Sequence, residues 1–265
     1  MNPSTIPAVL MGALAVLCLV IFFVGFRKAA VRSEGPARGG RLTLFASVIA
    51  LAWVSLIGVL AVNGFFEDVT QLPPRPVVAM LAWLPVVIAL TYTKAFRRLA
   101  LAAPPQWIIY FQSFRIAVEL LLFQAFVRGV MPVQMTFEGR NFDIVAGVLA
   151  LAVGYGVAKR SRNWRTFATL YNILGLALLV NVLIIALLSM PTPLRYFLND
   201  PAITIVGQFP FIYLPTVLVV LAYSFHILSL RQLYLLRKNE EAGNGDKAPG
   251  RERVIQVQTN VKKLQ

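Results

Sequence analysis

Hydrophobic residues occur along this chain in seven long blocks, separated by short polar or basic stretches. The blocks run over residues 6–26, 42–63, 77–94, 107–128, 142–158, 167–189 and 209–230. All but the short fifth block are close to the roughly 20 residues that a helix needs to cross about 30 Å of hydrocarbon. The pattern predicts an all-α membrane protein, in which residues 1–236 form a seven-transmembrane-helix bundle surrounded by the lipid bilayer.

Prolines and glycines interrupt this pattern between blocks and inside two of them. SEGPARGG at 33–40 separates the first two blocks, Pro85 lies near the centre of the third, and Pro210 and Pro215 lie in the first half of the seventh. A proline removes a helical N–H, so we expect kinks at these three positions. Residues 237–265 are rich in glycine and charge, which predicts a disordered cytoplasmic tail. Its segment 254–261 alternates apolar and polar residues, so it either adds to a partner's sheet or stays unstructured.

Composition supports the membrane class and excludes others. Hydrophobic residues make up 58% of the chain and charged residues 14%, whereas about a quarter of a soluble domain is charged. The net charge of +14 comes without an aromatic–basic recognition motif, so we expect no nucleic acid. One cysteine and one histidine cannot form a metal site with several thiolate or imidazole ligands, and we predict no metal and no cofactor. No protease or hydrolase motif occurs, which favours a protein that is not an enzyme.

The basic residues also predict an orientation. Twenty of the 25 lysines and arginines fall on one side of the predicted bundle and four on the other, with Arg115 inside the fourth block. Because cytoplasmic loops carry the excess of Lys and Arg, we expect the N-terminus outside and the C-terminus in the cytoplasm. The prediction is a multi-pass protein of the cytoplasmic (plasma) membrane.

The fourth block contains three polar residues that the bilayer should not tolerate. Gln112, Arg115 and Glu119 lie at spacings of three and four residues, on one face of a helix. Arg115 is about 12 Å deep at 1.5 Å per residue, and Glu119 is close to the midplane. A charged side chain there costs about 2.5–3.5 kcal/mol on insertion scales, so this face must point into the bundle.

Two interpretations of these residues stay open. In the first, they bind a small polar or anionic solute in a transporter or channel: Arg115 neutralises the solute, and Glu119 positions it or exchanges a proton. In the second, Arg115 and Glu119 form a purely structural ion pair within one helix. The protein is then a sensor or assembly partner that acts through its cytoplasmic loops and tail.

Other candidate residues lie on other segments. Asn172 and Asn181 in the sixth block are on nearly opposite faces, so only one of them can face Arg115. His226, near the inner end of the last block, is either a hydrogen-bonded interface residue or a proton carrier. The predicted outer loop TFEGRNFD forms either a solvated rim or the mouth of a cavity. Its charged residues are Glu138, Arg140 and Asp143.

Overall fold

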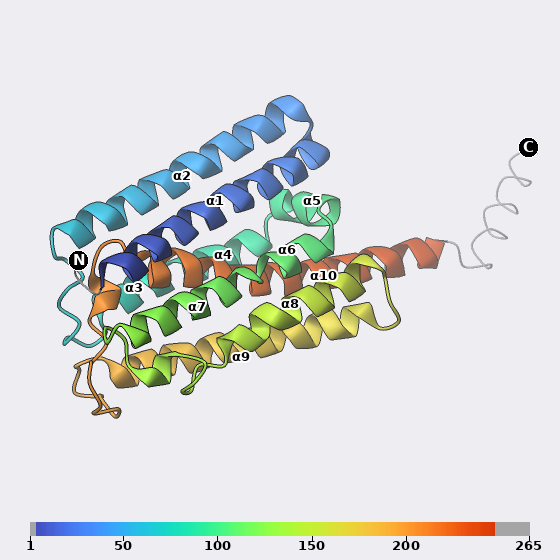
Figure 1. The fold of residues 1–265 in the computed structure, drawn as a ribbon. Helices are drawn as coiled ribbons and strands as arrows, with labels where there is room; N and C mark the ends of the chain where they lie inside the picture. Colours follow the sequence, from blue (N-terminus) through green and yellow to red (C-terminus); the bar gives the residue numbers. More distant parts are fainter. Residues whose placement is uncertain (1–3, 247–265) are drawn as a thin grey trace, which may run out of the picture.

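The structure, a computed structural model, describes residues 4–246, and among these it contains helices and no strand. Helices account for 76% of it. The elements are α1 (Thr5–Glu34), α2 (Pro36–Val62), α3 (Arg75–Leu81), α4 (Trp83–Thr91), α5 (Lys94–Ala102), α6 (Pro105–Phe111), α7 (Phe114–Val127), η1 (Val133–Met135), α8 (Asp143–Ala158), α9 (Trp164–Ser189), η2 (Ile205–Gly207), η3 (Leu214–Val219) and α10 (Val220–Asp246). Figure 1 shows the long helices side by side in one elongated bundle. The predicted all-α class is confirmed.

Five helical segments are long and apolar enough to cross a membrane. They are Thr5–Glu34, Pro36–Val62, Pro105–Val127, Trp164–Ser189 and Leu214–Glu241. A sixth candidate is the bent pair of Arg75–Thr91 and Lys94–Ala102, which turns by 82° at its break. The apolar helix α8 has only 16 residues. The length and apolar composition of these helices are those of a membrane protein, the class that the sequence predicted.

A single residue, Gly35, connects α1 to α2. Its φ of 79° lies in the left-handed region, which glycine adopts without steric cost. Pro36 then opens α2 at the first helical position, where a proline is tolerated. The break is therefore much shorter than the predicted 33–40, because the polar ends of both helices remain helical beyond their apolar blocks.

Two breaks divide the third apolar block, for which the sequence predicted one helix over 77–94. The nitrogen of Pro85 cannot donate to the carbonyl of Leu81, and the helix is interrupted between them at Ala82. At the other end the chain bends by 82° into α5, which Thr93 caps with its side-chain oxygen. The bend turns α5 across the direction of α3 and α4 (Figure 1).

The seventh block forms a helix that is longer than predicted. It begins with a π-helical turn, Leu214–Val219, that contains Pro215, and it continues as α10 to Asp246. Residues 237–246 are thus helical, where the sequence suggested an irregular tail. The rest of that tail, including the proposed strand 254–261, lies outside the described residues.

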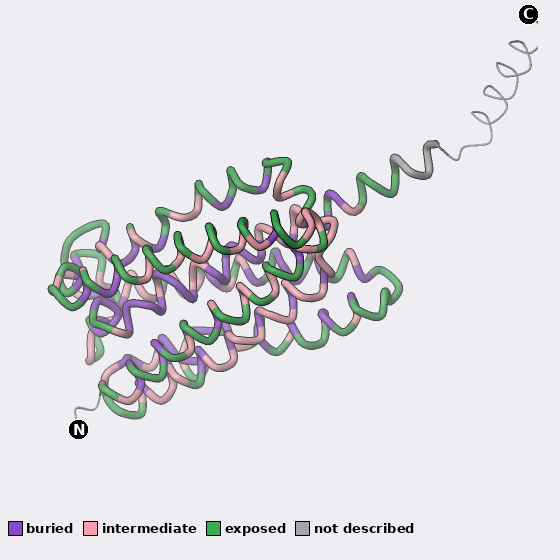
Figure 2. Tube along the Cα trace, turned by 90° about the horizontal axis from the view of Figure 1, so that it is seen from above, coloured by how far each residue is buried: buried purple, intermediate pink, exposed green. Residues whose placement is uncertain are grey.

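The core lies around α10 and the helices that contact it. In the span Leu214–Glu241, 61% of the most apolar window is buried, against 22% for α1 and 17% for α2. Figure 2 shows the same contrast, with buried residues along the middle of the bundle and exposed ones along its outer helices. The α1–α2 hairpin is therefore peripheral, and α10 is central.

Glycines on α8 let it approach α6 and α7 closely. A Cβ atom on Gly147 would lie 2.7 Å from the side chain of Ile116, and one on Gly154 would lie 2.6 Å from the ring of Tyr110. Small residues allow such close contact between membrane helices. The packing brings the start of α8, at Asp143, against α7.

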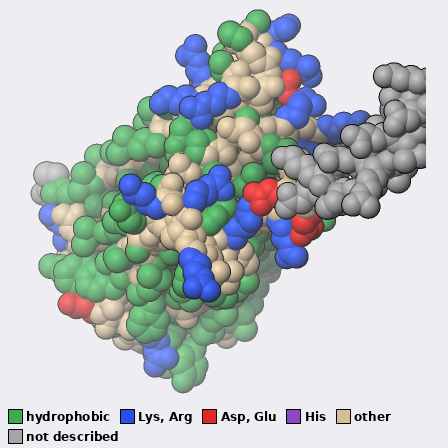
Figure 3. Space-filling model, turned by 90° about the vertical axis from the view of Figure 1, so that its right-hand side faces the viewer, with side chains coloured by type: hydrophobic (Ala, Val, Ile, Leu, Met, Phe, Trp, Pro, Cys, Tyr) green, Lys and Arg blue, Asp and Glu red, His purple; other side chains and the backbone are tan. Residues whose placement is uncertain are grey.

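The connections gather at the two ends of the bundle (Figure 1). One end holds the α1–α2 turn, α5, the α8–α9 turn and the C-terminal half of α10, and we call it the basic end. Figure 3 looks onto this end and shows many lysine and arginine side chains there. The opposite end holds the loops 63–74, 128–142 and 190–213.

Candidate functional site

A short break in the fourth apolar block positions the polar stripe. α6 ends at Phe111 and α7 begins at Phe114, and around the break the backbone N–H groups of Gln112 and Arg115 donate to carbonyls three residues earlier. Gln112 donates through Nε2 to the carbonyl of Ala222 on α10, at 2.9 Å. Gln112, Arg115 and Glu119 are each 1% exposed, so the stripe faces the interior of the bundle.

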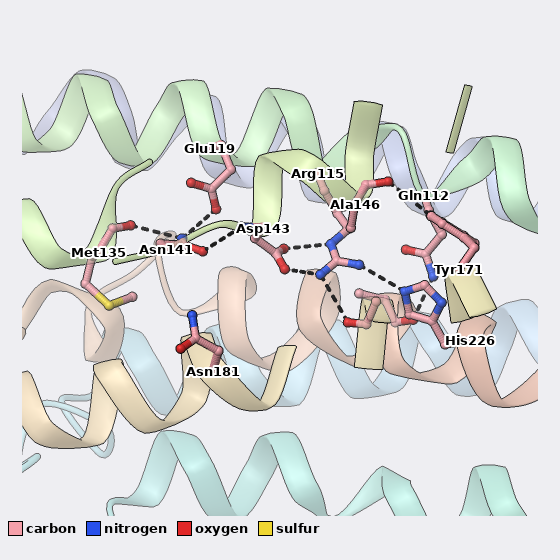
Figure 4. Close-up of polar contacts among 12 residues, drawn as sticks. Gln112, Arg115, Glu119, Met135, Asn141, Asp143, Ala146, Tyr171, Asn181 and His226 are labelled. Carbon is pink, nitrogen blue, oxygen red and sulfur yellow. Dashed lines mark hydrogen bonds and ion pairs between the residues drawn. The ribbon is translucent and has the colours of Figure 1, made fainter. Parts of the chain in front are cut away.

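Arg115 binds the first residue of α8, Asp143. Its Nε donates to Oδ2 at 2.6 Å, and its Nη2 pairs with Oδ1 of the same carboxylate. A two-point contact of this kind fixes the geometry of both groups. Asp143 also lies at a helix N-terminus, where the helix dipole stabilises a negative charge. This ion pair joins α7 to α8 inside the bundle (Figure 4).

Arg115 also contacts α9 and α10. Nη1 lies 2.9 Å from Nε2 of His226, and Nη2 lies 3.4 Å from the carbonyl oxygen of Gly175. With the two bonds to Asp143, four of the five N–H donors of the guanidinium have acceptors. Arg115 is thus almost fully occupied by the protein itself.

The contacts of His226 define its tautomer. Because Arg115 can only donate, Nε2 of His226 accepts, and the proton of the neutral ring is on Nδ1. Nδ1 then donates to Oδ1 of Asn172, 2.9 Å away. Asn172 in turn donates to the hydroxyl of Ser229 at 2.9 Å and to the carbonyl of Ala168 at 2.7 Å. This chain of bonds continues the network from α10 to α9.

Glu119 forms a second branch. Its Oε1 accepts a 2.6 Å hydrogen bond from Nδ2 of Asn141, which also donates to the carbonyl of Met135. Oδ1 of Asn141 accepts the backbone N–H of Asp143 at 3.1 Å, so Asn141 links the Glu119 carboxylate to the backbone at the start of α8. The other oxygen of Glu119, Oε2, is buried and has no hydrogen-bond partner among the described residues.

The ion pair between Arg115 and Glu119, one of the two interpretations of the stripe, is not found. Within the described residues Glu119 forms no ion pair, and the partner of Arg115 is Asp143, which the sequence placed in an outer loop that forms either a solvated rim or the mouth of a cavity. Asp143 is 6% exposed, because α8 begins inside the bundle rather than at its surface. Figure 4 shows Arg115 pointing toward Asp143 and His226, and Glu119 pointing toward Asn141.

The remaining candidates separate into two groups. Asn172 joins the network through His226, whereas Asn181 lies on the other face of α9 and donates to the carbonyl of Arg140 at 2.9 Å. Glu138 and Arg140 have exposed side chains, and neither joins the network. The expectation that only one of the two asparagines points toward Arg115 agrees with this arrangement.

Sequence reasoning missed three contributors. Gly175 supplies a carbonyl acceptor, and a Cβ atom there would overlap the ring of His226. Ser229, one turn after His226 on α10, accepts from Asn172. Tyr171 packs its ring against His226, with 5.5 Å between centroids. A glycine inside an apolar helix and a serine three residues from the only histidine were the available signals.

The two clefts described in the structure open elsewhere. One, with a volume of about 350 Å³, is at the basic end between α4, α5 and α10. The other, of about 270 Å³, is lined by residues of α8, α9 and the turn between them. Neither is lined by Arg115, Glu119 or His226. In this conformation Arg115 and Glu119 are 1% exposed and His226 is fully buried.

Comparison with known proteins places the network in a family. Residues 74–234, more than half of the chain, match the model described as "Domain of unknown function (DUF8737)". The chain belongs to this family. Every residue of the buried network falls within the DUF8737 match, whereas the α1–α2 hairpin precedes it. No curated protein and no solved structure matches the chain.

Proposed function

We propose that this DUF8737 protein is a plasma-membrane transporter or channel for a small polar solute, in which Glu119 holds a proton or a donor group of the solute. The observation that carries the proposal is the buried Oε2 atom of Glu119, which lacks a partner among the described residues. Arg115 and Asp143 neutralise each other, and among the described residues no cation pairs with Glu119. An unpaired buried carboxylate is costly, and a bound proton or solute donor removes that cost.

The proposed topology has seven spans, with the N-terminus outside and the C-terminus in the cytoplasm. The bent pair Arg75–Thr91 and Lys94–Ala102 and the short helix α8 add two crossings to the five long spans. In support, successive connections alternate between the two ends of the bundle in Figure 1. The basic loops gather at one end, which favours that end as cytoplasmic.

The role first expected for Arg115 changes in this proposal. Its guanidinium is bound to Asp143, so an anionic solute reaches it only by displacing that carboxylate. In this conformation Arg115 positions Asp143 and His226. Gln112 Oε1 and Glu119 Oε2 are both buried without a hydrogen-bond partner among the described residues, and only the carboxylate of Glu119 can exchange a proton, so we assign solute or proton binding to it.

Proton flux into proteoliposomes tests the proposal. Purified protein is reconstituted with a pH-sensitive dye inside, and a pH gradient is applied together with a potassium diffusion potential. We expect the wild type to acidify the lumen faster than protein-free liposomes, and Glu119→Gln to reduce the rate to the protein-free level. Glu138→Gln is the matched control, because it changes an exposed carboxylate in the loop 128–142. Its proton flux should equal that of the wild type. Wild-type flux through Glu119→Gln contradicts the proposal.

A structural role is the second candidate, and the near-complete satisfaction of Arg115 favours it. A network in which four of the five Arg115 donors are bound can hold α7, α8, α9 and α10 together without any movement of the helices. In that case Glu119→Gln leaves flux unchanged and alters only stability. The second candidate also accommodates the sensor or assembly function expected from the basic loops.

A further inference from the structure

The cleft at the basic end is lined by positive charge that the protein does not neutralise. Four cationic side chains line it, namely Lys94, Arg97, Arg231 and Lys238, and no acidic residue does. Among the residues that the structure describes, none of the four forms an ion pair. The described side-chain carboxylates of this end, Glu34, Glu240 and Glu241, pair with arginines outside the cleft. The unpaired positive charge of the cleft therefore favours the binding of an anion.

Two tyrosine rings contact Arg231 in this cleft. Its guanidinium lies over both, 4.9 Å from the centroid of Tyr92 and 5.0 Å from that of Tyr234. Its Nε donates to the carbonyl of Thr91 at 3.3 Å. Stacking and this bond fix the plane of the guanidinium, and its terminal nitrogens are suited to the oxygens of a phosphate.

The backbone at the N-terminus of α5 also favours an anion in this cleft. The nine-residue helix α5 begins at Lys94, directly after Thr93, and both residues line the cleft. The Thr93 side chain accepts the N–H of Phe96, and the earlier amides of the first turn have no partner within the helix. The N-terminal end of the helix dipole, which favours anions, is therefore at the cleft.

The position of the cleft indicates the source of the anion. Tyr92 and Tyr234 are 73% and 52% exposed, and tyrosines at the end of an apolar bundle are typical of the membrane–water interface. α5 lies across the bundle, with basic residues interleaved with apolar ones, as in helices that rest on a membrane surface. A volume of about 350 Å³ is in the range of a small-ligand site.

We propose that this cleft binds the phosphate of an anionic phospholipid headgroup, through Arg231, Lys94, Arg97 and Lys238. The phosphate lies at the α5 N-terminus, and its acyl chains follow the apolar surface of the bundle. The site is separate from the buried network and does not depend on the transport proposal.

Short-chain lipids added to the purified full-length protein in detergent test this site. Dioctanoyl phosphatidylglycerol, dioctanoyl phosphatidylcholine and inorganic phosphate are titrated separately, with binding followed by native mass spectrometry and by the unfolding temperature. We expect saturable binding of phosphatidylglycerol, and weak binding of the other two. The double variant Lys94→Gln/Arg231→Gln should lose roughly 30-fold in affinity, at about 1 kcal/mol per basic residue.

The control removes the same charge elsewhere on the basic end. Lys159→Gln/Arg162→Gln changes two exposed residues that do not line this cleft, and should keep wild-type affinity. Equal losses in the two double variants, or equal binding of phosphatidylglycerol and phosphatidylcholine, overturn the site. Tighter binding of inorganic phosphate than of phosphatidylglycerol overturns the lipid assignment. The ligand of the cleft is then a soluble phosphate compound. Unchanged unfolding temperatures without ligand show that both variants fold.

Discussion

The buried network and the basic cleft differ in whether the protein pairs their arginines with carboxylates. Arg115, 1% exposed, has its charge matched by Asp143 and four of its five donors bound. Arg231, at the edge of the bundle, has one hydrogen bond and two aromatic neighbours but no carboxylate among the described residues. The two arginines belong to one chain and differ chiefly in depth.

The difference follows from the cost of desolvation. A charge in the hydrocarbon region must be paired by the protein, since nothing else there can compensate it. A charge at the interface is compensated by water or by lipid headgroups, so the protein can leave it for a ligand. Within the network the same rule draws attention to Glu119, an acidic residue whose Oε2, like Oε1 of Gln112, is buried without a hydrogen-bond partner in the described structure.

Breaking the Arg115–Asp143 pair should give the largest effect. Arg115→Gln leaves Asp143 buried and unpaired, and Asp143→Asn does the same to Arg115, so each should lower the free energy of unfolding by about 3–5 kcal/mol. The double variant replaces the ion pair with two amides, and its loss should be smaller than the sum of the two. Unfolding in mixed micelles by titration with SDS measures all three.

A surface ion pair supplies the control for this comparison. Asp200 pairs with Arg195 at 3.2 Å, and its side chain is 89% exposed. Asp200→Asn should lower the free energy of unfolding by no more than about 1 kcal/mol. If Asp143→Asn costs as little, burial does not determine the strength of the pairing, and the contrast between the two regions fails.

Filling the space beside His226 should have an intermediate effect. Gly175→Ala places a methyl group where the imidazole ring lies, which displaces His226 from Arg115 or strains α9. We expect the free energy of unfolding to fall by about 1–3 kcal/mol, the usual cost of overpacking. The unfolding temperature in detergent measures it. Gly25→Ala in α1 meets no atom within 4 Å and should be neutral or stabilising by up to about 1 kcal/mol.

The two asparagines of α9 should show the smallest difference. Asn172→Ala removes the acceptor that orients His226, and should cost about 1 kcal/mol, the scale of a hydrogen bond between membrane helices. Asn181→Ala removes only a bond to the Arg140 carbonyl near the surface and should cost less than about 0.5 kcal/mol. Equal unfolding temperatures for the two variants would show that the His226 branch contributes little.

The sequence predicts the helical class and the interior position of Gln112, Arg115 and Glu119 well, because both depend on the cost of polar groups in lipid. It does not predict the partner of Arg115. A spacing of four residues favours Glu119, but the actual partner depends on how deep α8 begins and how closely its glycines let it approach α7. Those are tertiary properties, and the polar character of the 136–143 segment suggests a surface loop instead.

The length of the last helix has a similar explanation. Hydropathy detects the apolar part of a helix, so a span was predicted to end at Leu230. The helix itself continues into polar sequence, to Asp246. The Gly35 turn and the 82° bend before α5 also escape a hydropathy pattern, since backbone geometry rather than polarity defines them.

Helix α10 carries residues of both regions on one uninterrupted rod. His226 and Arg231 are five residues apart, about 7.5 Å along the axis at 1.5 Å per residue. If α10 rotates or slides as a rod, the contacts of Arg231 at the basic end change. His226 then moves relative to Arg115 by a comparable distance. In the lipid-site proposal, a headgroup that displaces α10 therefore also changes the contact between His226 and Arg115, and any such coupling is reciprocal in free energy.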